Sequence, residues 1–227
     1  KETEYILRQF GVSCPLVVVG RGVDIACFSP EHYSNVLRQQ WKATSETTVM
    51  LYVGRLSPEK EIDVVVNAYR AMKQRVEQDI KLVIVGDGPD RGRLETLCQG
   101  SDVIFTGVLT GLNLAQAYAS ANVFVFASQV ETFGNVVLEA MASGLPIIAY
   151  DYASAHLHVK HAETGWLSPL SDVSSLIQSI YALPNNQQLK AMGLLARKTV
   201  QHIGWQYPVH QFEEALYGVV KEIQMTS

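Results

Sequence analysis

Short apolar runs alternate with amphipathic segments along most of this chain. The runs have the composition of buried strands and lie at residues 48–53, 81–85, 103–105, 121–126 and 145–150. Segments with apolar positions at helical spacing follow them, at residues 62–72, 90–98, 112–120 and 134–143. Because parallel strands need a crossover connection, this order predicts an α/β fold, a Rossmann-like parallel sheet with helices on both faces.

The two ends of the chain show less regular patterns. Toward the N-terminus we expect a helix over residues 2–10, a buried strand over 15–20 and a polar surface connection over 31–47. Toward the C-terminus we expect a short strand at 164–167, then helices at 172–183, 188–202 and 208–224. The chain begins at Lys1 rather than Met, which suggests a fragment or a processed chain.

Composition and charge narrow the class of protein. The chain has 227 residues, of which 48% are hydrophobic, enough for a substantial core, yet no apolar run approaches the roughly 18 residues of a membrane span. A net charge of -4 argues against a nucleic-acid partner, which would favour a basic domain. Cys14, Cys27 and Cys98 form no C-x-x-C pair and fit a reducing cytoplasm.

Charged residues follow the strands at 48–53 and 121–126. The first loop, GRLSPEK at 54–60, brings Arg55 and Lys60 to the start of a helix, an arrangement that makes sense if an anion lies there. The second loop carries Glu131, and the helix after it carries Glu139 within an apolar run, where an unpaired charge is costly. Because ligands of parallel sheets bind at the carboxyl ends of the strands, both loops belong to one candidate site.

The start of the helix after Glu131 is a candidate anion site. If it begins near Thr132 or Phe133, the backbone N–H groups of Phe133, Gly134 and Asn135 have no acceptor within the helix. Thr132 can cap the same end.

Other motifs are incomplete. Gly86-Asp-Gly88 and Gly20-Arg-Gly22 follow apolar runs, but neither continues into G-x-G-x-x-G, so a dinucleotide-dependent oxidoreductase domain is a weak alternative. The histidines at 156, 158 and 161 match no common ligand spacing, and the chain has no Asp-x-Asp pair, so no metal site is predicted. P-loop and G-x-S-x-G motifs are absent.

Taken together, the motifs resemble those of family 4 of the retaining glycosyltransferases. Their residues are most similar to the motifs of GDP-mannose-dependent α-mannosyltransferases. The matching segments are Gly22-Val-Asp24 with Phe28-x-Pro30, Gly54-Arg-Leu-x-x-x-Lys60, Val85-Gly-Asp-Gly-Pro89, Phe105-Thr-Gly107 and Glu131-x7-Glu139. The resemblance implies a GT-B architecture, in which two Rossmann-like domains enclose the active site. This chain would be the C-terminal, nucleotide-sugar-binding half.

The resemblance also implies a domain division. Residues 1–47 would be the entry segment from the missing acceptor domain and its linker. Residues 48–204 would form the nucleotide-sugar-binding domain, and residues 205–227 a helix that crosses back to the missing domain.

Roles for individual residues follow from the same resemblance. Arg55, Lys60 and Glu131 would serve catalysis, the two cations by holding the donor diphosphate and Glu131 by binding hydroxyls of the donor sugar. Glu139 would bind the ribose. The remaining donor-binding residues would be Gly54, Gly86, Val108, Leu109, Thr132, Phe133, Gly134, Asn135 and Val136, with the base between the loops after Gly86 and Gly107.

The implied function is transfer of a sugar, with retention, from a nucleotide-diphosphate donor to an acceptor hydroxyl. GDP-mannose is favoured as the donor, a UDP-sugar is the alternative, and no tightly bound cofactor is expected. The acceptor, a glycan, lipid or small molecule, stays open, as does a non-catalytic nucleotide-sugar-binding module. We expect a cytoplasmic protein whose missing domain would make any contact with the inner face of a membrane.

Two segments depart from the family pattern. Glu61 follows Lys60 at a position where the family commonly has Gly, which would affect the loop geometry. Residues 152–161 lack the usual Gly-rich, Glu-containing sequence, so no contacts are assigned there.

Overall fold

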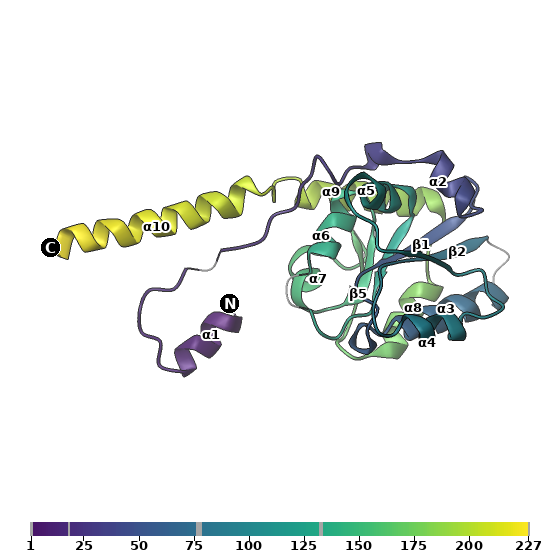
Figure 1. The fold of residues 1–227 in the computed structure, drawn as a ribbon, viewed down its shortest axis with the longest axis horizontal. Coiled ribbons are helices and arrows are strands. Elements are labelled where there is room, and N and C mark those ends of the chain that lie inside the picture. Colours follow the sequence, from purple (N-terminus) through teal and green to yellow (C-terminus); the bar gives the residue numbers. More distant parts are fainter. Residues whose placement is uncertain (1, 18, 76–78, 132–133, 227) are drawn as a thin grey trace. The chain divides into compact units, whose positions relative to one another are not determined.

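The computed structural model describes residues 2–17, 19–75, 79–131 and 134–226. Within these ranges, six parallel strands form one sheet in the order β3-β2-β1-β4-β5-β6 (Figure 1). The strands are β1 (Thr48–Val53), β2 (Ile80–Val85), β3 (Ile104–Gly107), β4 (Val123–Phe126), β5 (Ile147–Tyr150) and β6 (Gly165–Ser168). The predicted α/β class with a Rossmann-like parallel sheet is therefore confirmed.

The sheet is covered by helices on both faces. The helices of this part of the chain are α3 (Ile62–Arg75), α4 (Arg91–Leu97), α5 (Gly111–Ser120), α6 (Asn135–Ala142), α7 (Ala153–His158), α8 (Val173–Tyr181) and α9 (Asn186–Val200). Helix α3 packs with α4 and α8 in one layer, whereas α6 packs with α5 and α9 in the other (Figure 1). Every side chain of β1, β4 and β5 is buried, which explains why these strands read as continuous apolar runs.

The apolar face predicted for residues 62–72 is also confirmed. Ile62, Val65, Val66, Tyr69 and Met72 are all at most 3% exposed. Their spacing places them on one side of α3, against the sheet and α8.

Strand order reverses between β1 and β4. The chain runs outward from β1 to β2 and β3, then returns to place β4 on the other side of β1. In open parallel sheets such a reversal leaves a crevice at the carboxyl ends of the strands, where ligands bind. The loops that follow β1 and β4 are those predicted to carry Lys60 and Glu131.

Most residues of the predicted surface connection over residues 31–47 are exposed, but the segment also has helical structure and buried side chains. This segment contains a short 3₁₀ helix (Pro30–His32) and α2 (Asn35–Gln40), which contact α5. Arg38 is 4% exposed, and its guanidinium donates to the carbonyl oxygens of Ser120 and Thr47 at 2.8 and 2.7 Å. Both terminal nitrogens of the buried guanidinium are bonded in this way, whereas its Nε has no hydrogen-bond partner among the described residues. Polarity along the sequence does not reveal such burial.

The prediction of a buried strand over residues 15–20 was wrong. Among the described residues of this segment none is in a strand, and Val17 is 62% exposed. An apolar run becomes a strand only where a neighbouring strand can accept its backbone hydrogen bonds.

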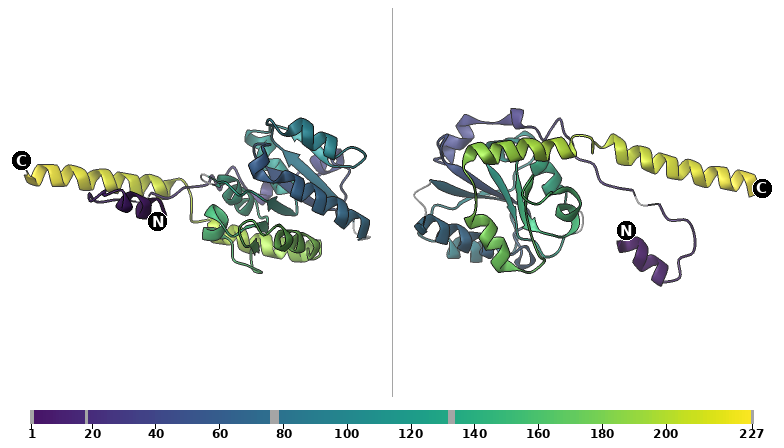
Figure 2. Two further views of the ribbon diagram at one scale, coloured as in Figure 1. Left: turned by 90° about the horizontal axis from the view of Figure 1, so that it is seen from below. Right: turned by 180° about the vertical axis from the view of Figure 1, so that it is seen from behind.

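Residues 1–22 and 202–227 form a compact unit separate from residues 23–201. The smaller unit contains α1 (Glu2–Gln9) and α10 (Gln206–Thr226), and Figure 2 shows α10, in yellow, as one continuous helix. The larger unit begins at Val23. The predicted relation of both ends to a missing domain stays a prediction.

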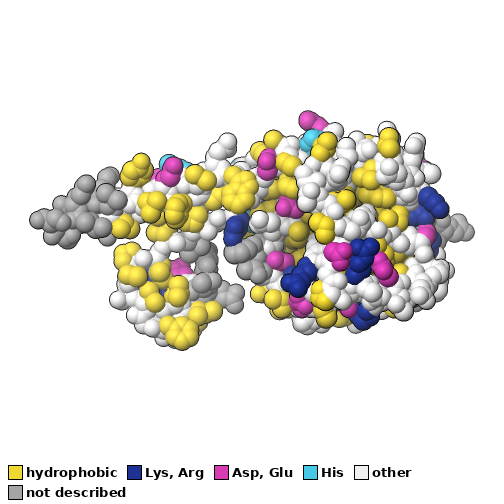
Figure 3. All heavy atoms as spheres, viewed as in Figure 1, with side chains coloured by type: hydrophobic (Ala, Val, Ile, Leu, Met, Phe, Trp, Pro, Cys, Tyr) yellow, Lys and Arg dark blue, Asp and Glu magenta, His cyan; other side chains and the backbone are white. Residues whose placement is uncertain are grey.

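Apolar side chains of α10 are exposed. Phe212 and Leu216 are 55% and 52% exposed, and Figure 3 shows hydrophobic side chains at the surface of this unit. In the described part of the chain, no helix is both long and apolar enough to cross a bilayer.

Candidate functional site

The loops after β1 and β4 meet at Lys60. Its Nζ donates to the carbonyl oxygen of Val130 at 2.7 Å and to Oγ of Ser128 at 3.1 Å. The same nitrogen lies 3.3 Å from Oε2 of Glu131 and 5.6 Å from the centre of the Phe126 ring. With side chains only 15% and 18% exposed, Lys60 and Glu131 form an ion pair that water screens less than a surface pair.

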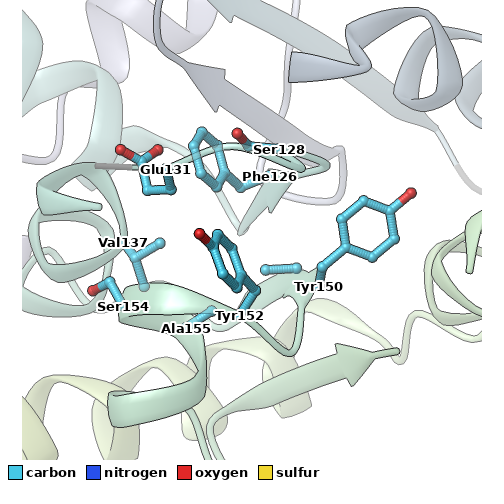
Figure 4. A pocket seen from close by; sticks show the side chains of 9 residues that line it. Phe126, Ser128, Glu131, Val137, Tyr150, Tyr152, Ser154 and Ala155 are labelled. Carbon is cyan, nitrogen blue, oxygen red and sulfur yellow. The ribbon is translucent and has the colours of Figure 1, made fainter. Parts of the chain in front are cut away.

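Glu131 also lines a small pocket at the ends of β4 and β5 (Figure 4). The ring of Tyr152 crosses this pocket with its hydroxyl on the side of Glu131, whereas the ring of Tyr150 extends in the opposite direction. Ser128 and Ser154 add hydroxyl groups to the lining. The pocket thus combines a carboxylate with several neutral hydroxyls, a set that suits hydrogen bonding to a polar ligand.

Helix α6 begins beside this pocket, with Gly134 at its N-cap. Thr132 and Phe133, two predicted site residues, lie outside the described residues, so the conditional prediction of a start there is replaced by the observed start at Asn135. Asn135 and Val136 are the first residues of the helix, where N–H groups have no intrahelical acceptor. The N–H of Asn135, one of the three predicted donors, is thus at the helix start, and that of Val136 joins it.

Gly134 is required by its surroundings. Its φ is +64°, and a Cβ atom added there would lie 2.4 Å from Cβ of Ser154. Ser154 is 6% exposed, and within the described part of the chain its Oγ and the buried Oδ1 of Asn135 have no hydrogen-bond partner. Because buried polar atoms are normally satisfied, two such atoms near one helix start point to a ligand site.

Glu139 has the partner that its apolar context requires. The hydroxyl of Tyr118 donates to Oε2 of Glu139 at 2.9 Å. Burial raises the pKa of the Glu139 carboxyl, and the hydrogen bond from Tyr118 acts in the opposite direction. Sequence reasoning missed Tyr118 because it lies on another helix, α5, in an ordinary apolar pattern.

A second cavity of about 220 Å³ lies at the ends of β1, β2 and β3. Its lining includes five predicted residues: Gly54, Arg55, Gly86, Val108 and Leu109. The structure therefore places Arg55 in this second cavity, apart from the pocket of Glu131. Val53, Val85 and Asp87 complete the lining and were not predicted.

The glycines of this cavity allow two loops to approach closely. The φ of Gly86 is +135°, and a Cβ atom there would lie 1.9 Å from the carbonyl oxygen of Gly54. A side chain at position 86 would push the loops after β1 and β2 apart. The cavity between them therefore requires glycine at this position.

Residues 152–161 have no assigned contacts from sequence, and in the structure this segment contains α7, Ala153–His158. His156 lies on this helix, with Nδ1 2.7 Å from Oδ1 of Asp151. Nδ1 of His161 accepts from the backbone N–H of Leu167 at 3.1 Å. Among the residues that the structure covers, no cluster of three or more His, Cys, Asp or Glu side chains is arranged to hold a metal ion.

The fold and this edge of the sheet define a Rossmann-like α/β domain with cavities at the carboxyl ends of its strands. The family model described as "Glycosyl transferases group 1" matches residues 34–199, so the chain belongs to this family. The predicted resemblance is therefore confirmed.

Curated relatives agree with this assignment. A GDP-mannose-dependent alpha-mannosyltransferase from Mycobacterium tuberculosis is 39% identical over 186 residues, which cover 82% of this chain and 46% of the relative. Sulfoquinovosyl transferase SQD2 from Arabidopsis thaliana is 31% identical over 203 residues, covering 87% of this chain and 39% of the relative. The chain thus spans about half the length of the curated relatives it matches, or less.

Solved structures share the fold. Sucrose-phosphate synthase from Thermosynechococcus elongatus superposes with a TM-score of 0.81 at 28% identity, covering 97% of this chain and 57% of that one. HepE from Anabaena, in complex with UDP and glucose, superposes with a TM-score of 0.73 at 25% identity, covering 87% of this chain and 55% of that one.

Proposed function

We propose that this chain is the donor-binding half of a retaining glycosyltransferase that transfers a sugar from a nucleotide-diphosphate donor to an acceptor hydroxyl. The observation that carries the proposal is the convergence of Lys60, Glu131 and the start of α6, where the loops after β1 and β4 meet. The cation and the backbone N–H groups suit the diphosphate of a donor and the negative charge that develops on it as the bond to the sugar breaks. The carboxylate suits hydroxyl groups of the sugar.

The donor would extend along this edge of the sheet. Its base would lie in the second cavity, between Gly86 and the backbone of Val108 and Leu109. Its ribose would hydrogen-bond to the free oxygen of Glu139, because Tyr118 occupies the other oxygen. The sugar would then reach the pocket lined by Glu131.

The diphosphate would lie between these two positions. Lys60, Arg55 and the N–H groups of Asn135 and Val136 would surround it, with Thr132 and Phe133 retained as predicted contacts. As the acceptor oxygen bonds to the anomeric carbon, the bond from that carbon to the phosphate oxygen breaks. Cations stabilise the negative charge on the departing diphosphate, which takes the acceptor proton.

GDP-mannose is the favoured donor because several curated relatives are named for it. A UDP-sugar is the alternative, since HepE, which is 26% identical to this chain, was crystallised with UDP-glucose. No tightly bound cofactor and no metal ion take part in this proposal. The acceptor, a glycan, lipid or small molecule, would be recognised by a second domain.

The length of the relatives supports a proposal about the rest of the protein. The relatives extend well beyond the matched region, which supports a second, N-terminal domain. The exposed apolar side chains of α10 suit a helix that packs against that domain. The reaction would occur in the cytoplasm, at the inner face of a membrane if the second domain binds one.

Calorimetry with GDP, UDP and a nicotinamide dinucleotide tests the proposal. We expect binding of GDP or UDP and none of the dinucleotide. Binding of the dinucleotide alone would replace the proposal with an oxidoreductase domain. A non-catalytic binding module would bind the nucleotide in the same way, but the complete protein would transfer no sugar.

A further inference from the structure

Glu61 has an unusual backbone conformation for a glutamate. It follows Lys60 directly, and its φ and ψ are 46° and 39°, in the left-handed region that glycine adopts most readily. A side chain in this conformation is retained where surrounding contacts over-determine it. The contacts of the Glu61 carboxylate therefore show what holds this backbone conformation.

Both carboxylate oxygens of Glu61 accept hydrogen bonds from neighbouring strand ends. Oε2 accepts from the hydroxyl of Tyr150, the last residue of β5, at 2.7 Å. Oε1 accepts from Nε2 of Gln129, in the loop after β4. Tyr150 is 2% exposed, and burial together with the bond to Glu61 raises the pKa of its hydroxyl, so it stays protonated and donates.

Glu61 therefore links its own loop to the loop after β4 and to the end of β5, at the carboxyl edge of the sheet. The backbone adds to this link, because the N–H of Gln129 donates to the carbonyl oxygen of Glu59 at 3.2 Å. Lys60 lies between Glu59 and Glu61, and Glu131 lies two residues beyond Gln129. The loops that carry Lys60 and Glu131 are thus tied together by hydrogen bonds between residues next to this ion pair.

We propose that Glu61 is a positioning residue of the donor site, which holds Lys60 and Glu131 at their working separation through Gln129 and Tyr150. This inference rests on the proposed function, because it assumes that Lys60 meets the donor diphosphate. Glu61 itself touches no donor group. Its loss lets the loops after β1 and β4 move relative to each other, which weakens recognition of the diphosphate but leaves the base contacts of Gly86, Val108 and Leu109 unchanged.

Two variants of Glu61 separate positioning from charge. Glu61→Gly removes the carboxylate at a backbone conformation that glycine accepts. Glu61→Gln removes the charge only, because its amide can accept from Tyr150 and donate to the side-chain oxygen of a rotated Gln129. Ser171→Gly is the matched backbone control, since exposed Ser171 also has a positive φ, 66°, and lies in the turn before α8.

Calorimetry with GDP and with guanosine, or with the uridine pair if UDP binds better, measures the effect. We expect Glu61→Gly to weaken diphosphate binding about tenfold, the usual effect of losing a hydrogen bond to a charged group, with nucleoside affinity unchanged. Glu61→Gln should bind both ligands nearly as the wild type does, and so should Ser171→Gly. Thermal unfolding shows that each variant is folded.

Two results would overturn the positioning role. One is wild-type diphosphate affinity in Glu61→Gly. The other is equal loss in Glu61→Gly and Glu61→Gln, which would assign the effect to charge. Failure of the wild-type chain to bind either diphosphate would instead refute the proposed function on which this inference rests.

Discussion

Nζ of Lys60 lies 3.3 Å from Oε2 of Glu131, and both side chains are largely buried. These two groups, assigned to the diphosphate and to the donor sugar, therefore balance each other's charge. Removing one breaks the ion pair and leaves the other partly buried without it, which is costly. Variants at either position should accordingly affect stability as well as binding, so each test below includes a measurement that separates the two.

Lys60→Ala should weaken binding of a nucleoside diphosphate by about 10- to 100-fold, because a charge-assisted hydrogen bond to phosphate is lost. Nucleoside affinity should change much less, since the nucleoside carries no phosphate. Calorimetry with both ligands measures the difference, and Lys198→Ala, an exposed lysine of α9, is the matched control. Equal losses for the two ligands would contradict the phosphate role.

Glu131→Ala in the complete enzyme should abolish most sugar transfer while the nucleotide alone still binds. The carboxylate is assigned to the sugar, and the nucleotide makes its contacts elsewhere along the edge of the sheet. A transfer assay combined with nucleotide titration tests this. Wild-type transfer rates would remove Glu131 from the site.

Glu139→Gln should raise the melting temperature at neutral pH and weaken nucleotide binding. Burial raises the pKa of Glu139 in the folded state, so the folded protein favours the protonated carboxyl. The stability that this preference contributes is present at low pH and is lost as pH rises through the raised pKa. The glutamine stays neutral, so its advantage should shrink as the pH is lowered. Melting curves over a pH series measure this trend, and an advantage that grows toward low pH would contradict it.

Tyr118→Phe should raise the pKa of Glu139 further, because the hydrogen bond that favours its charged form is removed. As the pH is lowered, Glu139 should therefore be protonated at a higher pH than in the wild type, and nucleotide binding should weaken from that higher pH. A pH series of nucleotide affinities tests this shift. An unchanged midpoint would show that Tyr118 does not support the carboxylate.

Gly86→Ala should destabilise the fold by about 1–3 kcal/mol or more, since it combines backbone strain with a clash against the Gly54 carbonyl. Gly92→Ala is the matched control, because Gly92 lies within α4 and an added Cβ meets no atom within 4 Å. Alanine there should be stabilising by about 1 kcal/mol through helix propensity. Urea unfolding of both variants measures the contrast, and similar effects would show that the loops after β1 and β2 can separate freely.

Much of the central fold could be predicted because buried parallel strands have a plain sequence pattern. Strands β1 and β2 are apolar on both faces, and α3 repeats its buried positions at helical spacing. The same pattern failed at residues 15–20, where apolar residues have no strand beside them among the described residues. Polarity also failed to show that Arg38, within residues 31–47, is buried, with a terminal guanidinium nitrogen bonded to the carbonyl oxygen of Ser120 on a distant helix.

The candidate site divides in the same way. Lys60, Glu131 and Glu139 could be found from sequence because charges at a helix start or within an apolar run are conspicuous. Tyr118, Gln129 and Ser154 could not, since each is ordinary in its own segment and gains a role only from a neighbour far along the chain. Glu61 was noted from sequence, but its left-handed backbone and its two partners are visible only in the structure.

The sequence by itself determined the alternation of strands and helices, the family and the charged residues of the strand ends, because these depend on local pattern and motif. Tertiary structure decided which charges meet, which glycines have no room for a side chain and which hydroxyls support a carboxylate. Those relations depend on the order of strands in the sheet, which places the ends of β1 and β4 side by side although many residues separate them in the chain.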